Sequence, residues 1–142
     1  MSDTLRVLDT DHLSLLRRGH AAVAARLRNT PPSQRATTIV NVEEQLRGRF
    51  AMIARARKAS EWVAAYSVFQ QTLEDLMQLR LLPFDDSAAA EFIRLKASVK
   101  QVGTQDVKIA AIVLSVDGIL VTRNQKDFAR IPGLAIEDWT QS

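Results

Sequence analysis

Short β-branched segments alternate with longer amphipathic segments along the 142 residues, and this alternation constrains the fold most strongly. Five short apolar segments are predicted as strands, at residues 6–8, 37–40, 81–84 (a strand or a connector), 118–122 and 134–136. The segments between them carry apolar residues every three or four positions, as helices that bury one face do. Strands that alternate with helices favour a parallel sheet covered on both faces. We therefore expect an α/β fold, a three-layer α/β/α sandwich around a short parallel sheet.

Two long amphipathic segments separate the second and third predicted strands. Asn41 is expected to cap the first helix, and Ser60 to begin the second. Together they predict a helical hairpin over about residues 42–80 that projects from the core. Residues 1–142 have the length of one domain, and the hairpin is expected to be part of it.

Composition excludes several classes of protein. The chain has no cysteine, which removes disulfides, zinc–cysteine sites and thiol nucleophiles, and its two histidines are too few for most histidine metal sites. His12 is expected to be a surface or packing residue of its helix. No glycine-rich phosphate loop or G-x-S-x-G turn is present. An acidic start and a longest apolar run of only 109–114 favour a soluble cytoplasmic protein without a membrane helix.

Acidic residues and one amide gather where the predicted strands end. These residues are Asp9 and Asp11, Glu43 and Glu44, Asp106 at the start of a buried helix, and Asn124 with Asp127. In open α/β sheets the ligands bind at the carboxyl edge of the strands. Crowded carboxylates repel unless a cation neutralises them, and oxygen-only ligands suit Mg²⁺ or Mn²⁺. The pattern predicts a metal site at this edge.

Each acid also has a structural interpretation. Glu44 follows Asn41, and Asp127 follows Asn124, at the spacing of a helix capping box. Asp106 lies in a first helical turn, where the helix dipole favours an acid. Asp11 and Glu43 are interpreted as first-turn helix acids rather than ligands. Asp9 ends an apolar strand and has no expected capping role, so it is the strongest candidate for function.

Basic residues continue from the acidic edge along the first hairpin helix. Arg47, Arg55 and Lys58 share a helical face with Glu44, and such a row could bind the phosphates of a nucleic acid. The alternative is a solvated face with a Glu44–Arg47 ion pair. The net charge of +3 is compatible with an anionic partner. The aromatic stripe of the second hairpin helix, Trp62, Tyr66 and Phe69, favours packing or a dimer interface over base stacking.

The order of these segments resembles PIN-domain ribonucleases, in particular the VapC-type toxins of toxin–antitoxin pairs. The segments that carry the resemblance are 7–11 (VLDTD), 44–48 (EQLRG), 103–111 (GTQDVKIAA), 121–128 (VTRNQKDF) and the ending 131–139. They cover residues 5–139 in the family's order. The resemblance implies a PIN-like sandwich and a Mg²⁺- or Mn²⁺-dependent endoribonuclease, usually a homodimer.

Carried onto this sequence, the resemblance assigns the metal ligands to Asp9, Glu44 and Asp106. The fourth family position, often an aspartate, corresponds to Asn124 here, and Asp127 follows closely. Because an amide carries no charge, a second metal would need negative charge from the substrate. The resemblance also implies a cognate VapB-type antitoxin and an RNA substrate, with tRNA the first expectation.

The residues and the resemblance together give a hypothesis for the chemistry. Asp9, Glu44 and Asp106 would hold one metal ion, with Thr10, Thr104 and Thr122 orienting them. Arg47 and Arg55 would bind phosphates rather than read bases. The alternative is a non-catalytic α/β module that docks a basic protein partner through its acids. A phospho-acceptor receiver domain fits poorly, because the middle strand is followed by Asn41 instead of an aspartate.

Overall fold

A five-stranded parallel sheet organises the computed structural model, which describes residues 3–141. The strands are β1 (Arg6–Leu8), β2 (Arg35–Thr38), β3 (Arg80–Leu82), β4 (Ile119–Val121) and β5 (Ala135–Glu137). Their order is β3-β2-β1-β4-β5, and every neighbouring pair is parallel. The first strand in sequence is therefore the central strand, and all strands end at the same edge.

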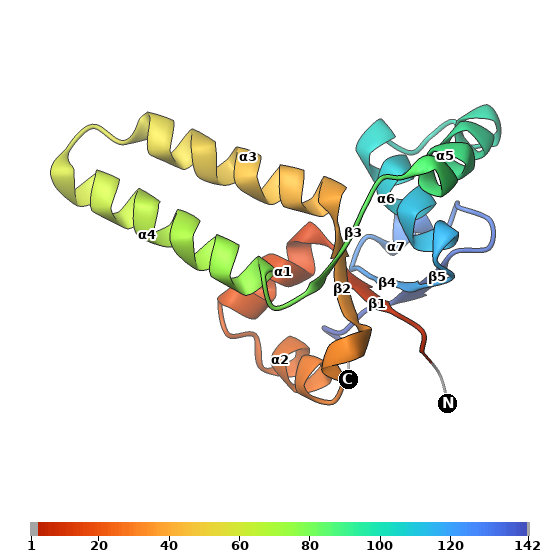
Figure 1. Cartoon of the computed structure of the whole chain (residues 1–142), viewed down its shortest axis with the longest axis horizontal. Helices are drawn as coiled ribbons and strands as arrows, with labels where there is room; N and C mark the ends of the chain where they lie inside the picture. Colours follow the sequence, from red (N-terminus) through yellow and green to blue (C-terminus); the bar gives the residue numbers. More distant parts are fainter. Residues whose placement is uncertain (1–2, 142) are drawn as a thin grey trace.

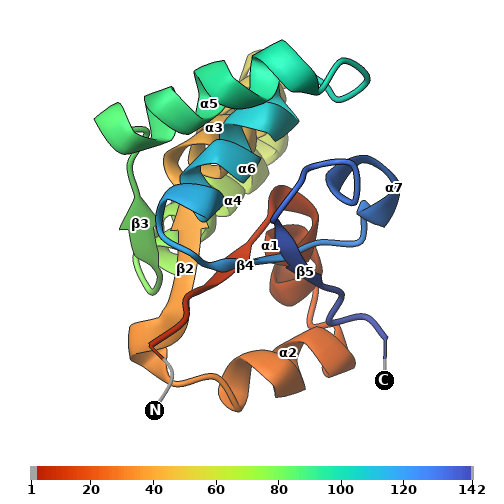
Figure 2. The same ribbon diagram turned by 90° about the vertical axis from the view of Figure 1, so that its right-hand side faces the viewer.

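Seven α-helices connect and cover the strands of the described region (Figure 1). They are α1 (Thr10–Arg17), α2 (Ala21–Arg28), α3 (Ile39–Arg55), α4 (Ala59–Leu76), α5 (Asp86–Ser98), α6 (Thr104–Ser115) and α7 (Gln125–Phe128), with a 3-10 turn at Pro32–Gln34. Figure 2 shows α5 and α6 on one side of the sheet and α1 and α2 on the other. The predicted three-layer PIN-like sandwich is confirmed.

Side chains that alternate along the central strands form the two cores. Val7 and Leu120 face the larger core, which α5 and α6 cover, whereas Leu8 and Val121 face a smaller core against α1 and α2. Consecutive strand residues point to opposite faces, so each short strand contributes to both layers. Helix α6 is buried on most sides, as its apolar sequence predicts, with six fully buried residues at Val107 and 109–113.

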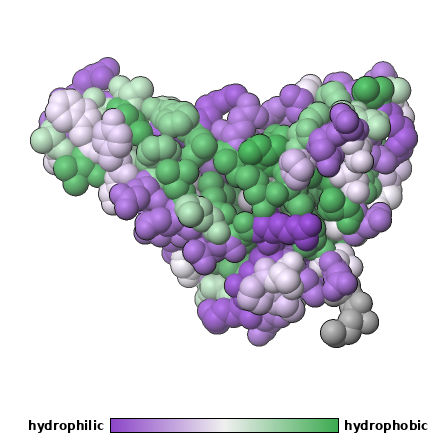
Figure 3. Space-filling view, in the orientation of Figure 1, coloured by the Kyte–Doolittle hydropathy of each residue, from purple (hydrophilic) through white to green (hydrophobic). Residues whose placement is uncertain are grey.

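The predicted hairpin is formed by α3 and α4, which project together away from the sheet (Figure 1). Its apolar residues are only partly covered. Trp62 and Tyr66 are about half exposed, at 47% and 56%, and Phe50, at 54%, packs against Phe69 with the two rings tilted. Figure 3 shows hydrophobic side chains along the hairpin.

Two predicted boundaries, the start and the end of the first hairpin helix, differ from the structure. The β-branched run 37–40 reads as a strand, but β2 is 35–38 and Ile39 already begins α3. The Thr38 hydroxyl accepts the Asn41 N–H and caps the helix, so Asn41 is a buried residue of the first turn. Lys58 lies beyond the end of α3 and does not share its basic face.

Within residues 3–141, no helix is both long enough and apolar enough to cross a membrane.

Candidate functional site

Asp9 follows β1 and caps α1, a role the sequence did not suggest. Its Oδ1 accepts the backbone N–H of His12 at 2.9 Å, and the side chain is nearly buried at the carboxyl edge. The expectation that Asp9 has no capping role is therefore wrong. The cap fixes the carboxylate where the central strand ends, because both β1 and the first turn of α1 hold its backbone.

Glu44 is held by a chain of hydrogen bonds that joins α3 to α1. The Thr10 hydroxyl donates to Glu44 Oε1 at 2.6 Å and accepts from Asn41 Nδ2 at 3.1 Å. Asn41 Oδ1 in turn accepts the Thr38 hydroxyl at 2.8 Å. Each side chain in this series donates to the next one toward Glu44, so the series of hydrogen bonds ends on the Glu44 carboxylate. Thr10 lies where the sequence hypothesis places it, whereas Asn41 acts as a link instead of the predicted cap.

A second set of contacts fixes α3 against α1. Gln45, which is buried, donates to the Thr10 carbonyl at 3.1 Å and to the Ser14 hydroxyl at 3.3 Å. Its own oxygen accepts from Arg49, whose Nε donates to Thr72 of α4 at 2.8 Å. The hairpin is thereby hydrogen-bonded to the helix that begins at Asp9.

Asp106 lies in the first turn of α6 and is partly buried. Burial raises the pKa of its carboxyl, and the charges of Glu44, Asp127 and Asp9 raise it further, in that order. Glu44, Asp127 and Asp9, from three other segments, therefore lie within electrostatic range of Asp106.

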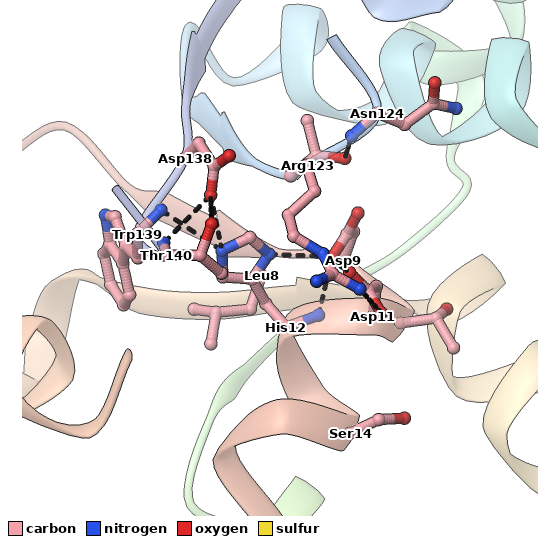
Figure 4. Close-up of polar contacts among 12 residues, drawn as sticks. Leu8, Asp9, Asp11, His12, Ser14, Arg123, Asn124, Asp138, Trp139 and Thr140 are labelled. Atoms are coloured by element: carbon pink, nitrogen blue, oxygen red, sulfur yellow. Dashed lines mark hydrogen bonds and ion pairs between the residues drawn. The ribbon is translucent and has the colours of Figure 1, made fainter. Parts of the chain in front are cut away.

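Asn124 and Asp127 form the capping arrangement that the sequence allowed. The Asn124 side chain accepts the Asp127 N–H at 3.4 Å and donates to Asp127 Oδ2 at 3.2 Å. Its backbone N–H donates to the buried Thr122 hydroxyl at 3.0 Å. Figure 4 shows the Asn124 amide pointing away from Asp9. Asp127, rather than Asn124, adds negative charge to the cluster.

The donor set suits a hydrated, oxygen-binding cation. Every acid of the cluster offers carboxylate oxygens, and the pKa of Asp106 is raised first by burial and then by neighbouring negative charge, which a cation would offset. Among the described residues no group of three or more acids, histidines or cysteines is close enough to hold a bare ion directly. Mg²⁺ usually keeps several waters, and these bridge longer gaps to carboxylates. A metal held at this cluster would therefore have to be bound partly through water.

Two ion pairs border the cluster. Arg123, directly after Thr122, makes a two-pronged contact to Asp11, at 2.5 Å from Nε and 3.0 Å from Nη2 (Figure 4). The hydrogen bond and charge of Asp11 raise the pKa of Arg123. On the other side, Glu43 pairs with Arg47 at 2.9 Å and accepts from Gln105 at 3.1 Å. Asp11 is a first-turn acid of α1, as interpreted, whereas Glu43 is not in the first turn of α3, which begins at Ile39, so that interpretation of Glu43 is wrong.

The predicted phosphate-binding arginines lie on the exposed surface of α3. Arg47 pairs with Glu43 rather than with Glu44, so the alternative Glu44–Arg47 pair is wrong. Arg55 is exposed at the last turn and makes no ion pair within the described residues. Thr104, the first residue of α6, is exposed and accepts from Lys96 at 3.5 Å, so it orients none of the acids here.

His12 is a site residue that the sequence reasoning missed. It is fully buried, and its Nδ1 lies 3.3 Å from Asp9 Oδ1. The available signal was its position three residues after Asp9, which places both its N–H and its ring near that carboxylate. Its other partner, Trp139, lies 127 residues away in the sequence and no spacing rule indicates it.

The comparisons with known proteins agree with this fold. A profile of the PIN domain matches residues 6–134, nearly the whole chain. The chain belongs to the PIN domain family. The structure of this PIN domain is similar to VapBC-1 from nontypeable Haemophilus influenzae, with a TM-score of 0.76 and 22% identity over 97% of this chain and 100% of that one. It is also similar to DNA-bound VapBC from Salmonella typhimurium, with a TM-score of 0.74 and 24% identity over 96% and 98% of the two chains.

Curated relatives match a shorter part of the PIN domain. A tRNA(fMet)-specific endonuclease VapC of Salmonella typhimurium is 35% identical over 68 residues, which are 45% of this chain and 52% of the relative. Ribonuclease VapC1 of Haemophilus influenzae is 40% identical over 47 residues, 33% and 35% of the two chains. The aligned segments thus span about half or less of these relatives' own length.

Proposed function

We propose that this PIN domain is a Mg²⁺- or Mn²⁺-dependent endoribonuclease, the toxin of a toxin–antitoxin pair. One observation carries the proposal: the carboxylates of Asp9 after β1, Glu44 in α3 and Asp127 in α7 lie close enough to act electrostatically on Asp106 in α6. An assembly of like charges at the carboxyl edge of a sheet opposes folding unless it serves to bind a cation. Membership of the PIN domain family and the names of the curated relatives support the reaction class.

In this proposal Asp9, Glu44 and Asp106 hold the metal, with Asp127 contributing charge nearby. A bound divalent cation would stabilise charge on a phosphodiester and lower the pKa of a water. The chain's own contribution is to orient the ligands. Thr10 fixes one oxygen of Glu44 by hydrogen bonding.

We propose RNA as the substrate, and tRNA as the first RNA to test, because one relative is named a tRNA(fMet)-specific endonuclease. Arg47 and Arg55 would bind phosphates that flank the cut. The exposed guanidinium of Arg47 can exchange its Glu43 partner for a phosphate at little cost, since exposed ion pairs contribute little.

We also propose a VapB-type antitoxin and a homodimer as the assemblies of this chain. The solved relatives described above are VapBC complexes. The half-exposed face of α4 with Trp62 and Tyr66 supports an interface on the hairpin.

The test is cleavage of total RNA by the purified, antitoxin-free chain with Mg²⁺, beside an Asp9→Asn variant and an EDTA control. We expect cleavage by the wild type and at least about a hundredfold less in either control, because even the outer partners of a metal contribute about ten- to a hundredfold. Mapping of the product ends would then identify the RNA.

The opposite result is equally informative. A folded wild type that cleaves neither total RNA nor purified tRNA, and whose melting temperature does not respond to Mg²⁺, would contradict the proposal. It would favour the non-catalytic binding module instead.

A further inference from the structure

His12 occupies the space between the acidic cluster and the C-terminal segment of the chain. Its side chain is completely buried, which is unusual for a histidine without a polar function. Both ring nitrogens have partners. Nδ1 lies 3.3 Å from Asp9 Oδ1, and Nε2 lies 3.2 Å from the backbone nitrogen of Trp139 (Figure 4).

The Trp139 contact assigns the position of the ring proton. A backbone N–H can only donate, so Nε2 must be the unprotonated nitrogen that accepts it. Nδ1 then carries the hydrogen and donates it to Asp9. The Asp138 carboxylate is 3.7 Å from Nε2, beyond hydrogen-bond distance, and is instead engaged by Thr140 at 2.6 Å and 2.9 Å. Each end of the imidazole thus has one defined partner.

Trp139 is itself firmly held. Its ring is buried in the smaller core with Leu8 and Val121, and it meets the His12 ring edge-on, at 83° and a centroid distance of 6.5 Å. The indole N–H donates to Glu137 Oε1 at 3.0 Å, and the Arg26 guanidinium lies 5.6 Å from the centre of the ring. The backbone nitrogen that His12 contacts is therefore a fixed point of the core.

The hydrogen bonds to Asp9 all reach one oxygen. Oδ1 accepts both the backbone N–H of His12 at 2.9 Å and its Nδ1–H at 3.3 Å. Within the described residues no hydrogen bond reaches Oδ2. Two donors from the same residue thus hold Oδ1, and Oδ2 is left without a donor from the described part of the chain.

We propose that His12 is a positioning residue that transmits the fixed position of Trp139 to the metal-binding carboxylate of Asp9. The inference rests on the proposed metal site. Outer partners that orient a ligand commonly contribute about ten- to a hundredfold to metal affinity. We assign that role here to a histidine whose far side is anchored on the C-terminal segment.

Two substitutions by isosteric amides test the contacts of the two ring nitrogens separately. In His12→Asn the amide nitrogen takes the place of Nδ1 and can still donate to Asp9. In His12→Gln the amide oxygen takes the place of Nε2 and can still accept from Trp139, but nothing replaces the donor to Asp9. Both variants leave every acid of the cluster intact.

The experiment titrates Mn²⁺ into wild type and both variants by calorimetry, with melting temperatures to confirm folding. We expect His12→Gln, which lacks the donor to Asp9, to weaken Mn²⁺ binding about tenfold or more, and His12→Asn, which keeps that donor but loses the Trp139 anchor, to weaken it by less. Equal affinity in all three proteins, or an equal loss in both folded variants, would overturn the inference. A wild type that binds no Mn²⁺ contradicts the proposed metal site itself, and so the two failures are distinguishable.

A measurement without metal tests the same contact if the variants do not fold. Long-range proton–nitrogen NMR of the metal-free wild type reports which ring nitrogen is protonated, with His20 as the internal comparison. We expect protonated Nδ1 and unprotonated Nε2 for His12. A proton on Nε2 would overturn the inference whatever the metal affinity.

Discussion

Asp106 is the acid of the cluster whose carboxyl pKa is raised by its surroundings. Three other carboxylates and partial burial all act on its side chain. Asp106→Asn removes the charge while keeping nearly the same volume. We expect the variant to keep its fold and to lose at least about a hundredfold in Mg²⁺-dependent RNA cleavage, since it removes a ligand rather than an outer partner. Wild-type cleavage by a purified Asp106→Asn protein would exclude Asp106 from the site.

The same residue predicts how stability depends on pH in the absence of metal. A carboxyl whose pKa is higher in the folded chain binds its proton more tightly there, so the free energy of unfolding falls as pH rises above the ordinary value of 3.8. Asp106→Asn lacks this effect. In EDTA we expect the variant to melt above the wild type at neutral pH, and the difference to shrink as the solution is acidified.

Melting curves of both proteins from acidic to neutral pH check this expectation. Mg²⁺ supplies the control, because a cation that binds the cluster should raise the melting temperature of the wild type more than that of the variant. A difference in melting temperature that stays constant with pH would show that the charge of Asp106 is not its cause.

At the scale of elements, the contact between α1 and α3 decides where Glu44 points. Thr10→Val keeps the shape of the side chain but removes the donor to Glu44 and the acceptor for Asn41. We expect about 1–3 kcal/mol of lost stability, the usual cost of an unpaired buried polar group. We also expect a loss of metal affinity of about tenfold. Calorimetric Mg²⁺ titration and urea unfolding measure the two effects.

Thr10→Ser is the matched control, because it keeps the hydroxyl and removes only a methyl group. It should resemble the wild type in metal affinity. If Thr10→Val and Thr10→Ser bound Mg²⁺ equally well, the hydroxyl would have no part in orienting Glu44.

The order of the elements was predictable from the sequence, whereas their caps were not. Periodicity identifies β1, β4 and the buried helix α6, because the pattern of apolar residues survives small errors of position. It misplaces the start of α3, since Ile39 and Val40 suit a strand as well as a buried first turn. Thr38 decides between them through a single hydrogen bond to the Asn41 N–H.

The candidate site shows the same division between local pattern and tertiary contact. Strand ends indicate which acids approach one edge of the sheet, and Asp9 and Glu44 do lie within electrostatic range of Asp106. The groups that orient them depend on contacts distant in sequence. Asn41 reaches Thr10 across 31 residues and His12 reaches Trp139 across 127, so no local pattern could reveal either.

At the scale of the whole molecule, the hairpin is the part of the chain whose apolar surface the fold leaves open. Trp62→Glu and Tyr66→Glu each place a charge on that surface, where both side chains are about half exposed. If this face joins two copies, we expect either variant to shift the chain toward the monomer with little change in its melting temperature, because a desolvated charge disfavours an interface.

Light scattering coupled to size-exclusion chromatography measures the mass in solution. Ala64→Glu, which is exposed on another face of α4, is the matched control and should leave the assembly unchanged. An unaltered dimer in the Trp62 and Tyr66 variants would place the interface elsewhere.

The central place of β1 in the sheet has a consequence for how the protein is made. Strand β1 leaves the ribosome before both of its neighbours, β2 and β4, and residue 119 must be synthesised before the second neighbour exists. The acids at positions 9, 44, 106 and 127 come from four successive stages of synthesis. A nascent chain therefore carries the Asp9 carboxylate without the groups that complete the cluster until residue 127 has been synthesised.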